Sequence, residues 1–262
     1  MSALSNYLTD SGTMLGRNLR HMRRYPVFLF MAAIPIVFLL LFVYVFGGTL
    51  GAGIAGVSGG RADYLAYVTP AIFLMTIAGS ATGTSVAVAT DMTEGIVARF
   101  RTMSISRASF LTGHVLGNVI QAMIAAALVA GVALLIGFRP TADPIAWIEA
   151  IGLLALSALA FAWLGVPLGL VSKSVGTASN LPLPLTLLPF LASGFVPTGS
   201  LPGPLRWFAE NQPFTPIIET VRGLLLGTPI GNSGLVAVAW CVAISAGGYL
   251  WAWRLYDRDP SH

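Results

Sequence analysis

Apolar residues in this chain are gathered into six long runs, separated by short polar or charged intervals. Each run is about twenty residues or longer, with no charge near its middle, and this is the length that an α-helix needs to cross a bilayer. The pattern therefore predicts six transmembrane helices. They occupy approximately Pro26–Phe46, Tyr64–Ala89, Phe110–Phe138, Ile145–Val171, Thr177–Val196 and Leu235–Trp253.

The fifth run differs from the others because it contains Pro182, Pro184 and Pro189. Each proline removes a backbone donor and bends a helix. Residues 197–234, which follow, contain no full-length apolar run. We expect short outer helices there that are re-entrant or lie at the interface, rather than a soluble domain.

One of these outer helices is predicted from Pro216 to about Leu226. Thr215 would be its N-cap and Gly227 its stop, and the helix would lie in or dip into the outer membrane interface. Glu219 and Arg222 are three residues apart on this helix, which favours an ordinary surface ion pair between them.

Residues 1–25 precede the first run and carry leucines on one predicted helical face, with four arginines near the end. This pattern predicts an amphipathic helix on the inner membrane surface, although a disordered basic tail would have the same composition. Six spans place both termini on one side. Most Lys and Arg residues fall on that side, so the termini are predicted to be cytoplasmic, in a multi-pass protein of the plasma or inner membrane.

The longest charged interval between apolar runs is residues 91–107. Asp91 followed by Glu94 has the spacing of a capping box, and Ile96, Phe100 and Met103 then form one apolar stripe. The basic residues Arg99 and Arg101 flank this stripe. A short helix with one apolar and one cationic face is expected. It is either an ordinary cytoplasmic loop or a docking element for a soluble partner.

Composition supports a membrane protein, because 56% of residues are hydrophobic and only 9% are charged. The net charge of +4 comes from basic residues scattered between apolar runs, which argues against nucleic-acid binding. Cys241 is the single cysteine, so no intrachain disulfide framework or thiolate metal cluster is possible.

The chain also has few residues suited to chemistry of its own. The histidines His21, His114 and His262 are far apart, and none has a ligand-like neighbour in sequence; His114 is expected to form a hydrogen bond near the inner interface. No ionisable residue lies at mid-span to hold a coupling ion, and Lys173 lacks the glycine pattern of a phosphate-binding loop. We therefore predict a chain that is not an enzyme, with no cofactor or metal of its own.

Polar residues within the predicted spans are candidates to face a transport cavity, because polar groups avoid lipid where they can. Hydrogen bonding between helices is the competing explanation for each of them. Gly79/Gly83, Gly113/Gly117 and Gly165/Gly169 have the spacing that lets helices approach closely, by default within the chain. The cavity candidates are Thr82, Ser85, Asn118, Gln121 and Thr186.

The order of these features resembles the membrane subunits of ABC-2 type exporters, and especially the daunorubicin-resistance permease group. In that family a Glu-Gly-then-basic helix and a Ser-Arg lie between spans two and three, and a proline-rich fifth span is followed by a C-terminal signature. The loop matches are Glu94-Gly95, Arg99-Phe-Arg101 and Ser106-Arg107. The signature matches are Ser193-Gly194, Pro197, Leu201-Pro202, Asn211-Gln212-Pro213 and Arg222-Gly223.

This resemblance implies one transmembrane domain over residues 1–262 and a coupling helix within residues 91–107 that sits in a groove of a separate ATP-binding subunit. Two permease chains, as a homodimer or related heterodimer, would work with two ATPase chains that carry ATP and Mg²⁺. A rigid lever with an apolar contact face also favours docking over a plain loop. The expected ATPase contacts are Glu94, Ile96, Arg99, Phe100, Arg101, Met103 and Arg107.

The implied function is export of amphiphilic drugs or lipid-like molecules from the cytoplasm or inner leaflet. Export of a polysaccharide or lipid-linked glycan is the alternative within the same class, and a stand-alone carrier or channel is the alternative outside it. Trp207, Phe208 and Phe214 are apolar residues of the outer segment, and we expect them to form a lid over the cavity mouth.

Overall fold

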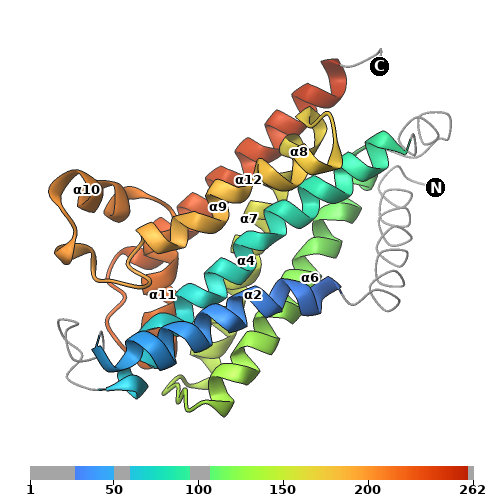
Figure 1. Cartoon of the computed structure of the whole chain (residues 1–262). Helices are drawn as coiled ribbons and strands as arrows, with labels where there is room; N and C mark the ends of the chain where they lie inside the picture. Colours follow the sequence, from blue (N-terminus) through green and yellow to red (C-terminus); the bar gives the residue numbers. More distant parts are fainter. Residues whose placement is uncertain (1–26, 50–59, 95–106, 259–262) are drawn as a thin grey trace.

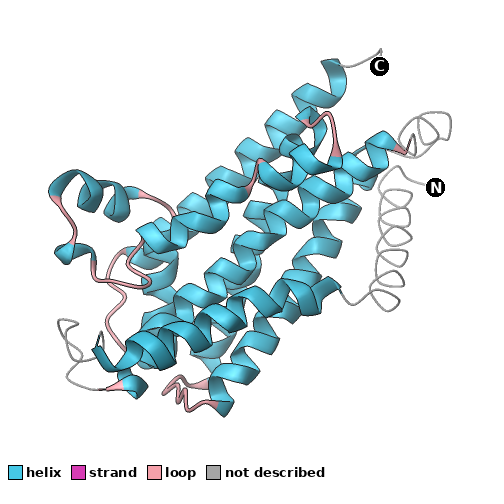
Figure 2. Cartoon of the chain, in the orientation of Figure 1, coloured by secondary structure: helices cyan, strands magenta, loops and turns pink. Residues whose placement is uncertain are grey.

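The computed structural model describes residues 27–49, 60–94 and 107–258, which form helices joined by turns (Figures 1 and 2). Five helices in these ranges are long and apolar enough to cross a membrane, as expected for an all-helical integral membrane protein. The predicted helix at 1–25 and most of the predicted docking element, residues 95–106, lie outside the described residues. The five candidate spans are Ala32–Thr49, Arg61–Thr93, Leu111–Leu135, Pro144–Val171 and Ser233–Leu255.

These spans correspond to five of the six predicted apolar runs. The local sequence explains why the fourth span begins at Pro144. Asp143 is its N-cap, and the Asp143 carboxylate accepts a hydrogen bond from the Ala146 backbone amide at 2.7 Å. Proline is also favoured at the first position of a helix. The elements are α2 (Val27–Leu41) with the π-helix η1 (Phe42–Phe46), α4 (Arg61–Thr93), α6 (Arg107–Leu135), α7 (Pro144–Val171) and α12 (Ser233–Arg258).

Helix α4 is the centre of the bundle. It contacts α2, α6, α7 and α11, and its buried residues extend from Tyr64 near its start to Asp91 in its last turn (Figure 1). A helix that is buried over most of its surface has no single apolar stripe, because several of its faces meet other elements. Displacement of α4 would therefore disturb most of the bundle.

Two glycines let α7 pack closely on α4. A Cβ atom added at Gly169 would lie 2.6 Å from the Ser85 carbonyl oxygen and 2.9 Å from Val88 Cβ, and one at Gly165 would overlap the Ala81 carbonyl oxygen. Such separations leave no room for a side chain, so the two backbones can approach this closely only at glycine. The predicted Gly165/Gly169 contact is confirmed as a contact within the chain.

The predicted fifth span is not one continuous helix, and this part of the six-helix prediction is corrected. It is divided into α8 (Val175–Asn180), α9 (Leu183–Leu187) and the 3₁₀ helix η2 (Leu188–Leu191), which all contact α4. Pro182 precedes α9, while Pro184 and Pro189 lie in the first turns of α9 and η2. The prolines divide the run because they cannot donate the backbone hydrogen bonds that a continuous helix needs.

The first span is joined to this divided segment by phenylalanine rings. The centroid of the Phe42 ring lies 4.7 Å from that of Phe195, and Phe38 meets Phe190 edge to face at 5.4 Å. Phe190 and Phe195 are stacked at 4.6 Å. These ring contacts connect α2 and η1 to the segment around η2.

Short helices in residues 197–234 are confirmed. They are η3 (Thr198–Ser200), α10 (Gly203–Asn211) and α11 (Phe214–Leu226), and α10 projects away from the bundle in Figure 1. Helix α11 ends at Gly227 as predicted, where φ is +68°, a conformation that favours glycine.

One detail of α11 differs from the prediction. It begins at Phe214, so Thr215 lies inside the helix and is not its N-cap; the Thr215 hydroxyl donates to the Ala209 carbonyl and accepts from the Ser193 amide. The helix is packed against α4, α7 and α12, and its place relative to the outer interface stays a prediction. Its buried apolar side chains recur at the spacing of one helical face, and these residues are Phe214, Ile217, Ile218, Val221 and Leu225.

Candidate functional sites at the two ends of the bundle

The two ends of the bundle carry different polar groups. We call the loop end the end where α4 finishes at Thr93 and α6 begins at Arg107. We call the hairpin end the opposite end, which carries α10 and α11 (Figure 1). Helix α4 reaches both ends.

A buried polar pair joins α4 to α6 at the loop end. Asp91 Oδ2 lies 2.9 Å from His114 Nε2, and the two residues are only 7% and 9% exposed. The predicted capping box at Asp91 and Glu94 is wrong, because α4 continues through Asp91 and Glu94 is the residue that caps its C-terminus. The expectation that His114 forms a hydrogen bond is confirmed, but its partner Asp91 was not foreseen.

The predicted ATPase contacts are only partly within the described residues. Glu94 is exposed at the end of α4, and Arg107 is the first residue of α6. The remaining five predicted contacts, Ile96 to Met103, lie in the range 95–106 outside the described residues. The role of this whole set stays a prediction.

The polar residues predicted for a cavity fall into two groups. Ser85 and Asn118 are buried within the bundle. A Cβ atom at Gly83 would overlap Asn118 Oδ1, and Asn118 Nδ2 donates to the His114 carbonyl at 3.0 Å. The other three are half-buried: Thr82 on α4, Gln121 on α6 and Thr186 on α9. The five residues come from three helices, and their contact with cargo stays a prediction.

At the hairpin end, Arg222 of α11 connects three segments. Its Nη2 donates to the Ser193 carbonyl at 2.8 Å and to the Tyr67 carbonyl at 3.1 Å, and its guanidinium carbon lies 3.9 Å from the centre of the Tyr67 ring. The Tyr67 hydroxyl donates to the same Ser193 carbonyl at 2.8 Å. Together these contacts tie α11 to α4 and to the chain after η2.

The predicted surface ion pair between Glu219 and Arg222 is therefore corrected. Among the residues that the structure describes, ion-pair distances occur between Asp91 and His114 and between Arg206 and Glu210. Glu219 instead accepts a hydrogen bond from the Ser233 hydroxyl at 3.3 Å. Helical spacing placed the two side chains close together, but the carbonyl groups beside Arg222 attract its guanidinium.

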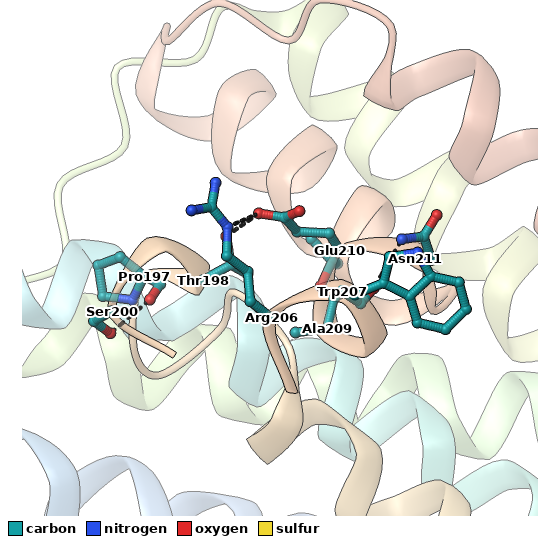
Figure 3. Close-up of polar contacts among 9 residues, drawn as sticks. Pro197, Thr198, Ser200, Arg206, Trp207, Ala209, Glu210 and Asn211 are labelled. Carbon is teal, nitrogen blue, oxygen red and sulfur yellow. Dashed lines mark hydrogen bonds and ion pairs between the residues drawn. The ribbon is translucent and has the colours of Figure 1, made fainter. Parts of the chain in front are cut away.

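The three predicted gate residues do not form one patch. Figure 3 shows α10, where the Arg206 guanidinium donates to Glu210 at 2.8 Å and the Trp207 ring is on a separate part of the helix surface. Trp207 is 68% exposed and Phe208 is 39% exposed. Phe214 is fully buried and stacks on Phe161 of α7 with centroids 5.1 Å apart, so it anchors the hairpin to the bundle.

Sequence comparison identifies the family of this chain. Residues 10–226 match the profile of the ABC-2 type transporter family, which is most of the chain. The chain belongs to this family. The five apolar helices of this ABC-2 permease accordingly make it a multi-pass membrane protein.

Curated relatives of this ABC-2 permease are named for drug resistance. The daunorubicin resistance ABC transporter permease protein DrrB1 of Streptomyces coeruleorubidus is 26% identical over 238 residues, covering 90% of this chain and 80% of the relative. The probable doxorubicin resistance ABC transporter permease protein DrrC of Mycobacterium tuberculosis is 25% identical over 150 residues, which is 57% of this chain and 54% of the relative.

The structure also explains why two parts of the C-terminal signature occur together. Ser193-Gly194 and Arg222-Gly223 are far apart in sequence, but Arg222 donates to the Ser193 carbonyl. A Cβ atom at Gly194 would overlap Ala71 of α4, so this backbone lies against the central helix. The Arg222 site was missed from the sequence because its acceptors are backbone carbonyls, which no residue pattern marks.

Proposed function

We propose that this chain is the membrane-spanning subunit of an exporter for amphiphilic drugs or lipid-like molecules. A separate ATPase subunit that binds ATP and Mg²⁺ energises it, and two copies of each chain form the transporter. The observation that carries this proposal is the family match over residues 10–226 together with a drug-resistance permease aligned over 90% of the chain.

The loop end is cytoplasmic in this proposal, in agreement with the excess of basic residues on that side. The termini are also cytoplasmic, and the membrane is the plasma or inner membrane. The divided segment from Val175 to Leu191 completes the sixth crossing, since it contacts α4 through α8, α9 and η2 in turn. A broken helix is tolerated within a membrane where neighbouring protein covers it.

The structure supports a mechanism in which α4 transmits movement between the two ends. It has 33 residues, which corresponds to a rod of about 50 Å. One end adjoins residues 95–106, where Ile96, Phe100 and Met103 would contact the ATPase. Near the other end, the Tyr67 carbonyl accepts from Arg222 of the hairpin. Movement imposed by the ATPase on the loop end would therefore reach α11 through one buried helix.

Cargo would pass along surfaces that the bundle leaves accessible. Gln121 and Thr186 are half-buried and are the first candidates to contact it in this conformation, whereas the hydroxyl of the half-buried Thr82 is enclosed. Ser85 and Asn118 would contact cargo only after α4 separates from its neighbours, because both are now enclosed. Trp207 and Phe208 on the projecting α10 are proposed to cover the outer mouth, and the buried Phe214 would hold that cover in place.

The decisive test is transport into inside-out vesicles that contain the purified chain with and without its ATPase, using daunorubicin as the probe. We expect accumulation that requires both chains and ATP, and none when the ATPase carries a disabled ATP site. Robust gradient-driven transport by this chain alone would refute the proposal. Transport that requires both chains but excludes daunorubicin would limit the error to the cargo class.

A further inference from the structure

We propose that the Asp91–His114 pair is a positioning element that fixes α4 against α6 at the base of residues 95–106. Through this pair, movement of the loop would reach both helices as one unit. This inference rests on the proposed function, in which those residues contact an ATPase. In this inference, Asp91 and His114 transmit movement from the ATPase contact to the helices, although neither residue touches ATP or cargo.

The position of the pair is the first argument. Asp91 lies two residues before the last residue of α4, and His114 lies seven residues after the first residue of α6. Residues 95–106 connect these two helices in the sequence. The two helices that flank this segment are thus joined by a side-chain contact of 2.9 Å, about half a turn from the end of α4 and about two turns from the start of α6.

The surroundings of His114 are the second argument. Leu111 and Val115 on α6 belong to an apolar cluster with Ala162 and Val166 of α7 and Ala252 of α12. These contacts hold α6 against α7, but apolar contacts do not specify one register strongly. The Asp91–His114 pair adds a directional contact between α6 and α4.

The burial of the pair is the third argument. Taking a carboxylate out of water is costly. Replacing a buried charged pair by well-packed apolar residues of similar size often leaves the stability of a protein unchanged or higher. Buried polar contacts are best known for fixing register between helices. A pair that is less than one-tenth exposed at this junction is therefore expected to specify how the helices move together.

The experiment uses the full chain reconstituted with its ATPase, and it compares Asp91→Asn and His114→Gln with the swap variant Asp91→His/His114→Asp. Four quantities are measured: ATPase pull-down, basal ATP hydrolysis, daunorubicin-stimulated hydrolysis, and drug exported per ATP. Ser80→Ala is the matched control, because the Ser80 hydroxyl also links α4 to a neighbour, donating to the Ala158 carbonyl at 3.2 Å.

We expect both single variants to keep ATPase binding and basal hydrolysis. Drug-stimulated hydrolysis and export per ATP should each fall at least about fivefold, which is the low end of the effects typical of coupling between two sites. The swap variant should recover much of the export per ATP, and Ser80→Ala should resemble the wild type. A merely stabilising contact would change the amount of folded protein but not export per ATP.

Normal export per ATP in Asp91→Asn would overturn the inference, as would a folded swap variant as defective as the single ones. Loss of ATPase binding would also overturn it, because the pair would then belong to the docking surface. If Asp91→Asn does not fold, the double variant Asp91→Leu/His114→Leu removes both polar groups; folded protein with normal coupling refutes the inference. A wild type that binds the ATPase but is not stimulated by daunorubicin would instead show that the proposed cargo class is wrong, and a wild type that transports without the ATPase would refute the proposed function.

Discussion

Arg222 gives the most direct test of how the hairpin end is held. We predict that Arg222→Met lowers the free energy of unfolding by about 2–3 kcal/mol. A hydrogen bond to a charged group contributes about 1.5–3 kcal/mol, and Arg222 serves two carbonyls, those of Tyr67 and Ser193. Its position over the Tyr67 ring adds about 0.5–2 kcal/mol. The net loss is smaller than this sum because methionine avoids burying a charge, and the Tyr67 hydroxyl still donates to Ser193.

The assay is reversible unfolding of the purified chain in mixed micelles, followed by circular dichroism. The matched control is Arg206→Met, since Arg206 forms a pair with Glu210 in which both side chains are about half exposed. An exposed pair of this kind contributes about 0.2–1 kcal/mol, so this variant should unfold almost as the wild type does. Arg222→Lys retains the charge but not the planar fork of donors, and it should restore only part of the loss.

The result that would refute this reasoning is equal stability of Arg222→Met and Arg206→Met. In that case, the contacts to Tyr67 and Ser193 would be offset entirely by the cost of burying the guanidinium. A loss in Arg222→Met that Arg222→Lys fully restores would show that the positive charge matters and the geometry of its donors does not.

Three further predictions concern packing, docking and the outer hairpin. Gly169→Leu should abolish expression of folded protein, measured as size-exclusion yield, because α4 occupies the space that the new side chain needs. Gly152→Leu is the control and should give a normal yield, because a Cβ atom there meets nothing within 4 Å. Phe100→Ala should lose ATPase pull-down and drug-stimulated hydrolysis, since truncating a buried aromatic anchor costs on the order of 2 kcal/mol or more; normal values would mean that the apolar face is misassigned. Trp207→Ala should reduce export without changing stability, whereas Phe214→Ala should cost about 3–5 kcal/mol in unfolding; the opposite pattern would reverse their roles.

The sequence by itself determined the membrane class and most helix positions. Long apolar runs can bury their backbone polar groups in lipid only as helices, so their lengths place α2, α4, α6, α7 and α12 to within a few residues. The stop of α11 at Gly227 was predictable for a local reason, since glycine tolerates a positive φ.

Only the tertiary structure decided which polar residues meet. Asp91 had the local spacing of a helix start, but it lies inside the last turn of α4 because α6 brings His114 beside it. Arg222 had a suitable partner three residues away in Glu219, yet it binds the carbonyls of Tyr67 and Ser193. Local patterns report contacts along one helix, and these contacts join residues from different helices. The side chains that connect the two ends of the bundle therefore appear only when the helices are packed.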